Sequence, residues 1–119
     1  MARKILFVDD DREWRSVVGT WLRDAGYEVV SASDATEAMV APEGVKLDLI
    51  ILDLNLAGED GLELGRFLKR NHPGVPIILY TGQEHDYQTV HAMMQQGASR
   101  YLRKGSKEEL LNSVRVFLP

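Results

Sequence analysis

The chain has 119 residues, a formal net charge of -4 and no cysteine. This length suits one domain, residues 1–119, with a buried core and no room for a second, and the lack of cysteine excludes disulfide frameworks and thiolate metal sites and favours a reducing, intracellular compartment. Because basic residues are scattered and outnumbered by acids, and apolar runs are far too short for a bilayer, we expect a cytoplasmic protein with no direct nucleic-acid or membrane contact.

The hydrophobic pattern alternates between strand-like runs and helical spacing. In chain order it predicts a strand at 5–8, a helix between an N-cap at Asp11 and a stop at Gly26, a strand at 27–32, a helix at 34–40 opened by the acidic cap Asp34, a strand at 49–52, a helix at 61–71, a strand at 77–80, a helix from Tyr87 to Gly97, a strand at 98–103 and a helix beginning after Ser106. Five β/α units joined by right-handed crossovers favour an open, doubly wound α/β domain over a closed eight-unit barrel.

The first helix carries the clearest helical signal. Its apolar residues recur at intervals of three and four, which predicts one core-facing stripe; they are Trp14, Val17, Val18, Trp21 and Leu22. We therefore interpret both tryptophans as core residues; Trp14 also lies one turn from Asp10, close enough to report on metal binding.

Polar residues follow four of the strands: Asp9 and Asp10, Asp53, Thr81, and Lys104. Parallel strands end at one edge of a sheet, where such folds bind ligands. Three carboxylates crowded there repel one another unless a cation binds, and Mg²⁺ is the usual partner of carboxylates, water and a phosphate oxygen. The hydroxyl and the ammonium suit an oxyanion, which points to a phosphoryl group. Asp53 ends the central run and is the best-placed nucleophile.

The order and spacing of these residues match a known family. Over essentially its whole length the chain resembles the receiver domain of two-component response regulators. The motifs that carry the resemblance are Asp9-Asp10, Asp53-Leu54-Asn55-Leu56 running on to Asp60-Gly61, Thr81-Gly82 and Tyr101-Leu102-Arg103-Lys104. The resemblance implies a flavodoxin-like fold, with a five-stranded parallel sheet in the order 2-1-3-4-5 flanked by five helices.

The resemblance also implies site roles. Asp53 would accept a phosphoryl group from a histidine kinase or a histidine phosphotransfer protein. Asp10 and Asp53 would bind Mg²⁺ directly, with the backbone carbonyl of Asn55 as a third ligand and Asp9 acting mainly through water. The domain would then be a signalling phosphoacceptor that assists its own phosphorylation and dephosphorylation, not an enzyme acting on other substrates.

A conformational switch follows from the same resemblance. Thr81 would move toward the phosphoryl oxygens and Tyr101 would rotate inward, which changes the face built from the fourth helix, fifth strand and fifth helix. That face would serve an output domain, a partner protein or a phosphorylation-dependent dimer. Taken alone, Tyr101 is equally typical of a packed strand residue.

Two residues depart from the family pattern. Gly105 follows Lys104 where the family usually carries proline, commonly in a cis peptide, so we expect Lys104 to be less firmly positioned. Ala57 replaces another usual proline, which predicts a looser loop after Asp53. The chain is either a stand-alone receiver or a piece of a longer regulator or hybrid kinase.

Two other functions remain open at this point. A phosphatase of the haloacid dehalogenase type also uses a strand-end aspartate with a second aspartate two residues later, a spacing that Asp9 and Asp11 meet. Glu13 does not fit that motif, and the chain is too short for a cap domain. A receiver fold that only docks partners, without phosphorylation, is the third hypothesis, and the complete set of polar residues argues against it.

Overall fold

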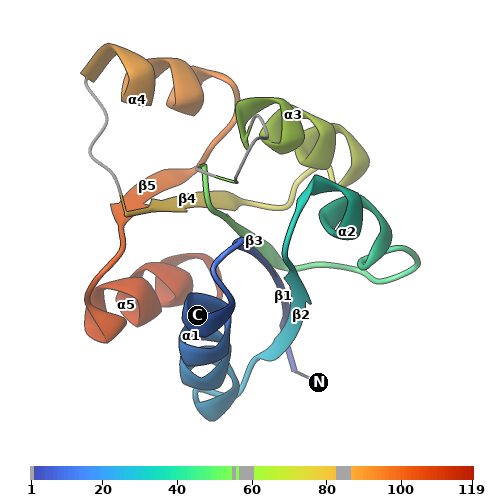
Figure 1. Ribbon diagram of the computed structural model, residues 1–119, viewed down its shortest axis with the longest axis vertical. Helices are drawn as coiled ribbons and strands as arrows, with labels where there is room; N and C mark the ends of the chain where they lie inside the picture. The colour runs from blue at the N-terminus through green and yellow to red at the C-terminus, as the bar shows by residue number, and fades with distance from the viewer. Residues whose placement is uncertain (1, 55, 57–60, 83–86) are drawn as a thin grey trace.

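The computed structural model describes residues 2–54, 56, 61–82 and 87–119. A parallel sheet of five strands in the order β2-β1-β3-β4-β5 lies between two layers of helices (Figure 1), which confirms the predicted flavodoxin-like order. The elements are β1 (Lys4–Val8), α1 (Arg12–Asp24), β2 (Glu28–Ala32), α2 (Ala35–Val40), β3 (Leu49–Leu52), α3 (Gly61–Asn71), β4 (Ile77–Thr81), α4 (Tyr87–Gln95), β5 (Arg100–Arg103) and α5 (Lys107–Phe117).

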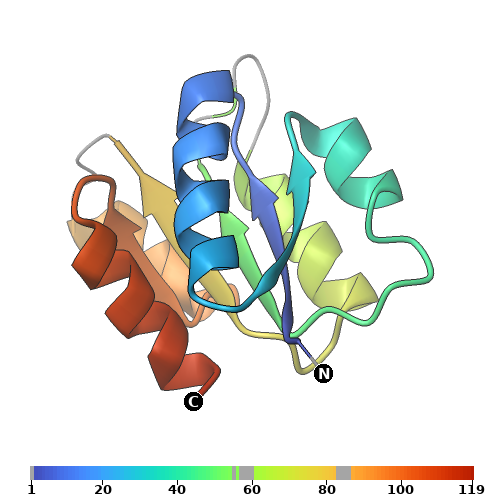
Figure 2. The same ribbon diagram turned by 90° about the horizontal axis from the view of Figure 1, so that it is seen from below.

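The helices divide between the two faces of the sheet. Helices α1 and α5 cover one face, and α2, α3 and α4 lie on the other (Figures 1 and 2). Successive side chains of a strand point to opposite faces, so Ile5 and Phe7 join the core beneath α1 and α5, while Leu6 and Val8 join the core beneath α2 and α3. Both cores therefore anchor the same strands from opposite sides.

The central strands are buried along their whole length, as the apolar runs predict. Every residue of β3 and β4 is buried, and so is β1 after Lys4. The edge strands differ: in β5 only Leu102 is buried, and in β2 only Ala32. Edge strands have one neighbour and one open side, which explains their more polar sequences.

Side-chain caps set the helix starts as predicted. Asp11 Oδ1 accepts hydrogen bonds from the backbone N–H groups of Glu13 at 2.9 Å and Trp14 at 3.2 Å. Asp34 and Ser106 cap α2 and α5 in the same way. These caps satisfy N–H groups that have no partner within the helix.

The second strand begins at Glu28, one residue later than predicted. The N–H of Tyr27 donates to Leu22 O at 3.1 Å, and the N–H of Gly26, at a φ of 98°, donates to Arg23 O at 2.9 Å. This pair of bonds closes the end of α1 around a left-handed glycine. Tyr27 therefore belongs to the helix terminus and not to the strand.

The core stripe predicted for α1 is wrong at one position. Val18 and Leu22 are buried, but Val17 remains 40% exposed. Five residues at this spacing span a wider arc than the helix can press against the sheet, so the outermost side chain faces solvent. Gly19 is buried instead.

Candidate functional site

The strand register places two aspartates side by side. Val8 of β1 pairs with Leu52 of β3, and each is the last residue of its strand. The chain then continues the ladder by one bond on each strand: Asp53 N donates to Val8 O at 2.9 Å, and Asp9 N donates to Ala32 O at 3.0 Å. Backbone pairing thus fixes both residues at the carboxyl edge of the sheet.

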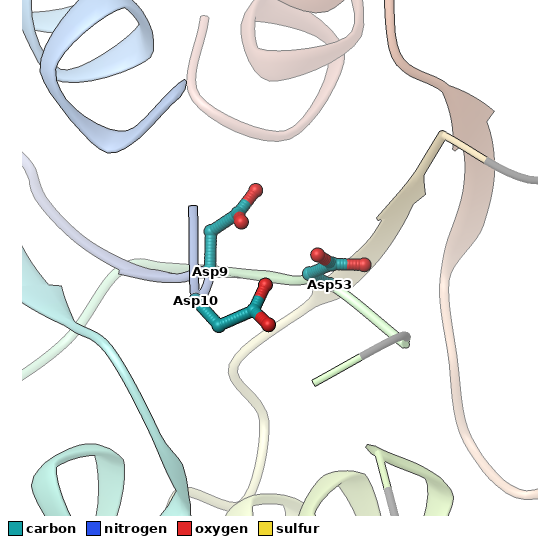
Figure 3. A group of neighbouring side chains, drawn as sticks. All are labelled: Asp9, Asp10 and Asp53. Atoms are coloured by element: carbon teal, nitrogen blue, oxygen red, sulfur yellow. The ribbon is translucent and has the colours of Figure 1, made fainter. Parts of the chain in front are cut away.

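The predicted acidic cluster forms at this edge. Asp9, Asp10 and Asp53 each contribute one carboxylate oxygen to a group whose atoms all lie within 4.8 Å of one another (Figure 3). Asp9 is 0% exposed and Asp53 is 2% exposed, whereas Asp10 is open to solvent. Oxygen ligands at this separation, with one of them accessible from solvent, suit a hard divalent cation such as Mg²⁺.

Lys104 provides a positive charge within the cluster. Its Nζ lies 2.7 Å from Asp9 Oδ2 and 3.1 Å from Asp53 Oδ2, and its side chain is only 17% exposed. Its backbone N donates to Thr81 O at 2.8 Å. The Lys104–Gly105 peptide is trans. The structure thus places the ammonium of Lys104 between two carboxylates although no proline follows the residue.

Burial and crowding govern the protonation of these groups. Burial raises the pKa of the Asp9 carboxyl, and the charge of Asp53 adds to the rise, against the opposing effects of Lys104 and the Asp11 N–H. For Lys104, burial favours the neutral amine, but the hydrogen bond to Asp9 and the charges of Asp53 and Asp9 outweigh it and raise the pKa. Lys104 therefore stays protonated, and the carboxylates of the cluster outnumber its single positive charge.

The sequence pattern did not predict two groups that hold Asp9 in place. The N–H of Asp11 donates to Asp9 Oδ1 at 2.9 Å, and Arg15 Nη1 donates to the Asp9 carbonyl at 2.7 Å. Arg15 lies one turn along α1 from Asp11. This spacing was the only sequence feature that could have indicated that Arg15 lies near the site. Its direction toward the site depends on how α1 crosses the sheet.

A cluster of aromatic side chains borders the site on the α1 side through Trp14. Trp14 stacks on Tyr80, with ring centroids 6.2 Å apart, and meets Trp21 edge-on at 5.8 Å. Lys104 Nζ lies 5.8 Å from the centroid of the Trp14 ring. Trp14 is thus a partly buried core residue whose ring also borders the candidate site, in keeping with its predicted position one turn from Asp10.

The remaining predicted residues occupy different surroundings. Thr81 ends β4 and is fully buried. Tyr101 pairs with Leu79 in the sheet and packs, partly buried, against the core on the α3 side. The backbone carbonyl of Asn55, a predicted metal ligand, lies outside the described residues.

Asp11 does not enter the acidic cluster. It is exposed, and its carboxylate accepts the two N–H bonds at the start of α1. The aspartate pair required by the phosphatase alternative is therefore divided between a buried site residue, Asp9, and a helix cap.

The strand order and the acidic centre at the strand ends define a class of flavodoxin-like α/β domains. The sequence profile of the response regulator receiver domain family matches residues 5–115. The chain belongs to this family, as the resemblance predicted.

Individual relatives agree with this assignment. The DNA-binding response regulator MtrA of Mycobacterium tuberculosis is 34% identical over 119 residues, which cover 99% of this chain and 51% of MtrA. The CAI-1 autoinducer sensor kinase/phosphatase CqsS of Vibrio cholerae is 31% identical over 120 residues, covering 98% of this chain and 17% of CqsS. The chain thus spans about half of one curated relative and a smaller part of the other.

A solved structure gives the same result for the fold. The chemotaxis protein CheY4 of Vibrio cholerae matches with a TM-score of 0.91 and 30% identity, covering 98% of this chain and 99% of that one. Within the described residues, no helix is both long and apolar enough to cross a membrane.

Proposed function

We propose that this receiver domain is the phosphoacceptor of a two-component phosphorelay and that Asp53 receives the phosphoryl group. The observation that carries the proposal is the placement of Asp53: it is buried at the end of β3, its Oδ2 lies 3.1 Å from Lys104 Nζ, and one of its oxygens belongs to the acidic cluster. A carboxylate so placed is a nucleophile with a fixed orientation and a neighbouring cation for the incoming charge.

The donor set fits Mg²⁺. Three carboxylates cluster at the sheet edge, two of them are buried, and those two share the ammonium of Lys104, so negative charge is in excess where solvent screens it least. Asp10 and Asp53 would bind the ion directly, together with the backbone carbonyl of Asn55, and Asp9 would support it through water. Bound Mg²⁺ would supply charge neutralisation for the phosphoryl oxygens.

The chain's own residues account for the transfer step. An oxygen of Asp53 attacks the phosphorus of a phosphohistidine; the new O–P bond forms as the P–N bond breaks, and the histidine nitrogen takes a proton from solvent as it leaves. Lys104 neutralises charge on the transferred group, and the Thr81 hydroxyl donates to one of its oxygens. Dephosphorylation is a separate step: water attacks the phosphorus of the acyl phosphate, the bond between phosphorus and the Asp53 oxygen breaks, and phosphate and the Asp53 carboxylate are released.

The switch follows from the new charge. A dianion on Asp53 attracts the Thr81 hydroxyl at the end of β4. Tyr101 would then rotate inward on β5, and the face formed by α4, β5 and α5 would change. An output domain, a separate partner or a second phosphorylated copy would recognise that face.

The phosphoryl donor is a histidine kinase or a histidine phosphotransfer protein. One relative is named a sensor kinase/phosphatase and another a DNA-binding response regulator. Sequences similar to this chain therefore occur both in a sensor kinase and in a response regulator. This supports a role within such a relay, with the output carried by another domain or protein.

One experiment separates this proposal from its two alternatives. The chain is incubated with Mg²⁺ and acetyl phosphate, and intact mass is followed for wild type and Asp53→Asn. A single phosphoryl adduct that is sensitive to hydroxylamine and absent from Asp53→Asn is the expected result.

Two outcomes contradict the proposal. Rapid multiple turnover of unrelated phosphate esters, retained in Asp53→Asn, indicates a phosphatase centred on Asp9. A wild-type chain that neither gains an adduct nor responds to Mg²⁺ indicates a docking module.

A further inference from the structure

The face of one aromatic ring lies beside the ammonium group of the site. Lys104 Nζ is 5.8 Å from the centroid of the Trp14 ring, within the distance of about 6 Å at which a cation is attracted to an aromatic face. Trp is the most effective ring for this contact. The same ammonium contacts Asp9 and Asp53, so Trp14 and the two carboxylates surround one charge.

Trp14 itself is held firmly. Its backbone N–H donates to Asp11 Oδ1 at 3.2 Å in the first turn of α1. Its ring stacks on the fully buried Tyr80 at an interplanar angle of 30°, and Trp21 meets it at 80°. The indole Nε1 is buried with no hydrogen-bond partner among the described residues. Packing against other rings therefore fixes the position of the Trp14 ring, although its indole N–H makes no hydrogen bond to the described residues there.

The backbone beyond Lys104 gives little support. Gly105 is exposed at a φ of 154°, and an added Cβ there would meet nothing within 4 Å. Glycine at such a φ is conformationally permissive. The lysine stem passes Gly82, where an added Cβ would lie 3.7 Å from Lys104 Cδ. The orientation of the side chain therefore depends on what surrounds its stem and its head.

We propose that Trp14 is a positioning residue for Lys104, whose ring face holds the ammonium at the phosphoacceptor. The inference rests on the proposed function of Asp53. A cation bound by the acidic cluster would weaken both of the ion pairs of Lys104, because it competes for the same carboxylates. The ring does not bind that cation, so its attraction for the ammonium persists when the ion pairs weaken.

Trp21 provides a matched control. It belongs to the same helix and the same aromatic cluster, packs against Trp14 and lies partly buried. Among the described residues, the one aromatic ring that it contacts is Trp14. In Trp21→Leu the Trp14 ring keeps its stacking on Tyr80, so positioning predicts a much smaller effect for Trp21→Leu than for Trp14→Leu, whereas a purely structural role of the cluster predicts that the two variants act alike.

The experiment combines kinetics with a readout that needs no phosphorylation. Phosphorylation by acetyl phosphate with Mg²⁺ is measured for wild type, Trp14→Leu, Trp14→Phe, Trp21→Leu and Lys104→Met, and for the double variant W14L/K104M. The proton shifts of the Lys104 ε-methylene are recorded by NMR in the metal-free proteins, and thermal melts confirm that each variant folds.

Positioning predicts that Trp14→Leu slows phosphorylation by about 2-fold to 30-fold, the range expected for a cation–aromatic contact. Trp14→Phe restores part of the rate, Trp21→Leu stays within about 2-fold of wild type, and Trp14→Leu has no further effect once Lys104 is Met. The ε-methylene protons are shifted upfield by the ring in wild type and Trp21→Leu but not in Trp14→Leu.

Equal slowing by Trp14→Leu and Trp21→Leu, the same slowing in the Lys104→Met background, or unshifted methylene protons in wild type would overturn the inference. Failure of the proposed function looks different: wild type gains no adduct on Asp53, while the methylene shifts still report whether the ring faces Lys104.

Discussion

Adjacent aspartates at the end of β1 have different surroundings and therefore different capacities. Asp9 is fully buried, with Oδ1 fixed by the Asp11 N–H and Oδ2 beside Lys104. Asp10 is exposed, so a hydrated cation can reach it from solvent without disturbing the fold. Alternation of side chains at a strand end gives one rigid carboxylate and one accessible carboxylate.

Tyr80 provides a test of burial at a single hydroxyl. Tyr80 is 1% exposed, and its hydroxyl has no hydrogen-bond partner in the part of the chain that the structure describes. Burial raises the pKa of Tyr80 to about 12, only partly opposed by the nearby Gly105 N–H. We expect Tyr80→Phe to leave the unfolding free energy at pH 7 unchanged or raised by up to about 1 kcal/mol, because no bond is lost.

The pH dependence has a definite sign. Above pH 10 the unfolded chain loses the Tyr80 proton while the folded chain keeps it, so stability falls as the pH rises from 10 toward 12, by about 2–3 kcal/mol for this group. Chemical denaturation at pH 7 and at pH 11 should show that Tyr80→Phe gains relative stability at the higher pH. A difference between the two proteins that is the same at both values contradicts the burial argument.

For single residues, the sequence predicts a place in the site when the end of a strand alone puts the residue there. Asp9 and Asp53 follow strands whose apolar runs are unmistakable, and Thr81 ends a third such strand, so their placement at one edge needs only the parallel sheet. Trp14 and Arg15 lie on α1, and their contacts with the site depend on the rotation and tilt of that helix. Those are set by the packing of Val18 and Leu22 against the sheet, which no local pattern determines.

Helix α3 begins close to Leu54, the residue that follows Asp53. An added Cβ at Gly61 would lie 2.6 Å from Leu54 O and 2.8 Å from Leu54 Cα, both backbone atoms. A glycine there allows the helix start to approach the residue next to Asp53. The position of α3 and the geometry of the site are thus coupled through the backbone.

We expect Gly61→Ala to lower the unfolding free energy by about 1–3 kcal/mol and to slow phosphorylation of Asp53, because the Leu54 backbone must move. Thermal melts and intact-mass kinetics measure the two effects.

Gly65→Ala is the matched control on the same helix. Its Cβ would meet only Leu52 Cδ2, at 3.4 Å, and alanine in a helix interior adds up to about 1 kcal/mol. If both variants were equally stable and equally fast, the close approach at Gly61 would have no role in the site.

Element boundaries show where local signals suffice. The Asp11, Asp34 and Ser106 caps are visible in the sequence and start their helices as expected. The start of β2 was missed because the N–H of Tyr27 closes α1 and does not pair in the sheet. A glycine predicts that a helix ends, but it does not predict how many of the following residues donate hydrogen bonds to the last carbonyl groups of that helix.

Across the whole molecule, two cores hold the strands rigid and leave the carboxyl edge of the sheet for the site. The carboxylates of the acidic cluster at that edge repel one another, and a bound cation would reduce that repulsion. We therefore expect Mg²⁺ to stabilise the folded chain by mass action, by about 1.4 kcal/mol at ten times its dissociation constant.

Replacement of single carboxylates by amides tests this linkage. Asp10→Asn should fold normally and lose most of the Mg²⁺-dependent rise in melting temperature. Asp11→Asn should keep that rise, because asparagine also caps a helix and the residue lies outside the cluster. A loss in Asp11→Asn equal to that in Asp10→Asn would show that Mg²⁺ acts through general charge and not at this cluster.

The central claim is that Asp53 forms the acyl phosphate, and borohydride mapping tests it directly. The chain is phosphorylated with acetyl phosphate and Mg²⁺, reduced with borohydride, digested and sequenced by mass spectrometry. We predict conversion of Asp53 to homoserine, dependent on Mg²⁺, with Asp9 and Asp10 unmodified. Homoserine at position 9 or 10, or at no aspartate while the intact chain carries the adduct, would contradict the assignment of Asp53 as the phosphoacceptor.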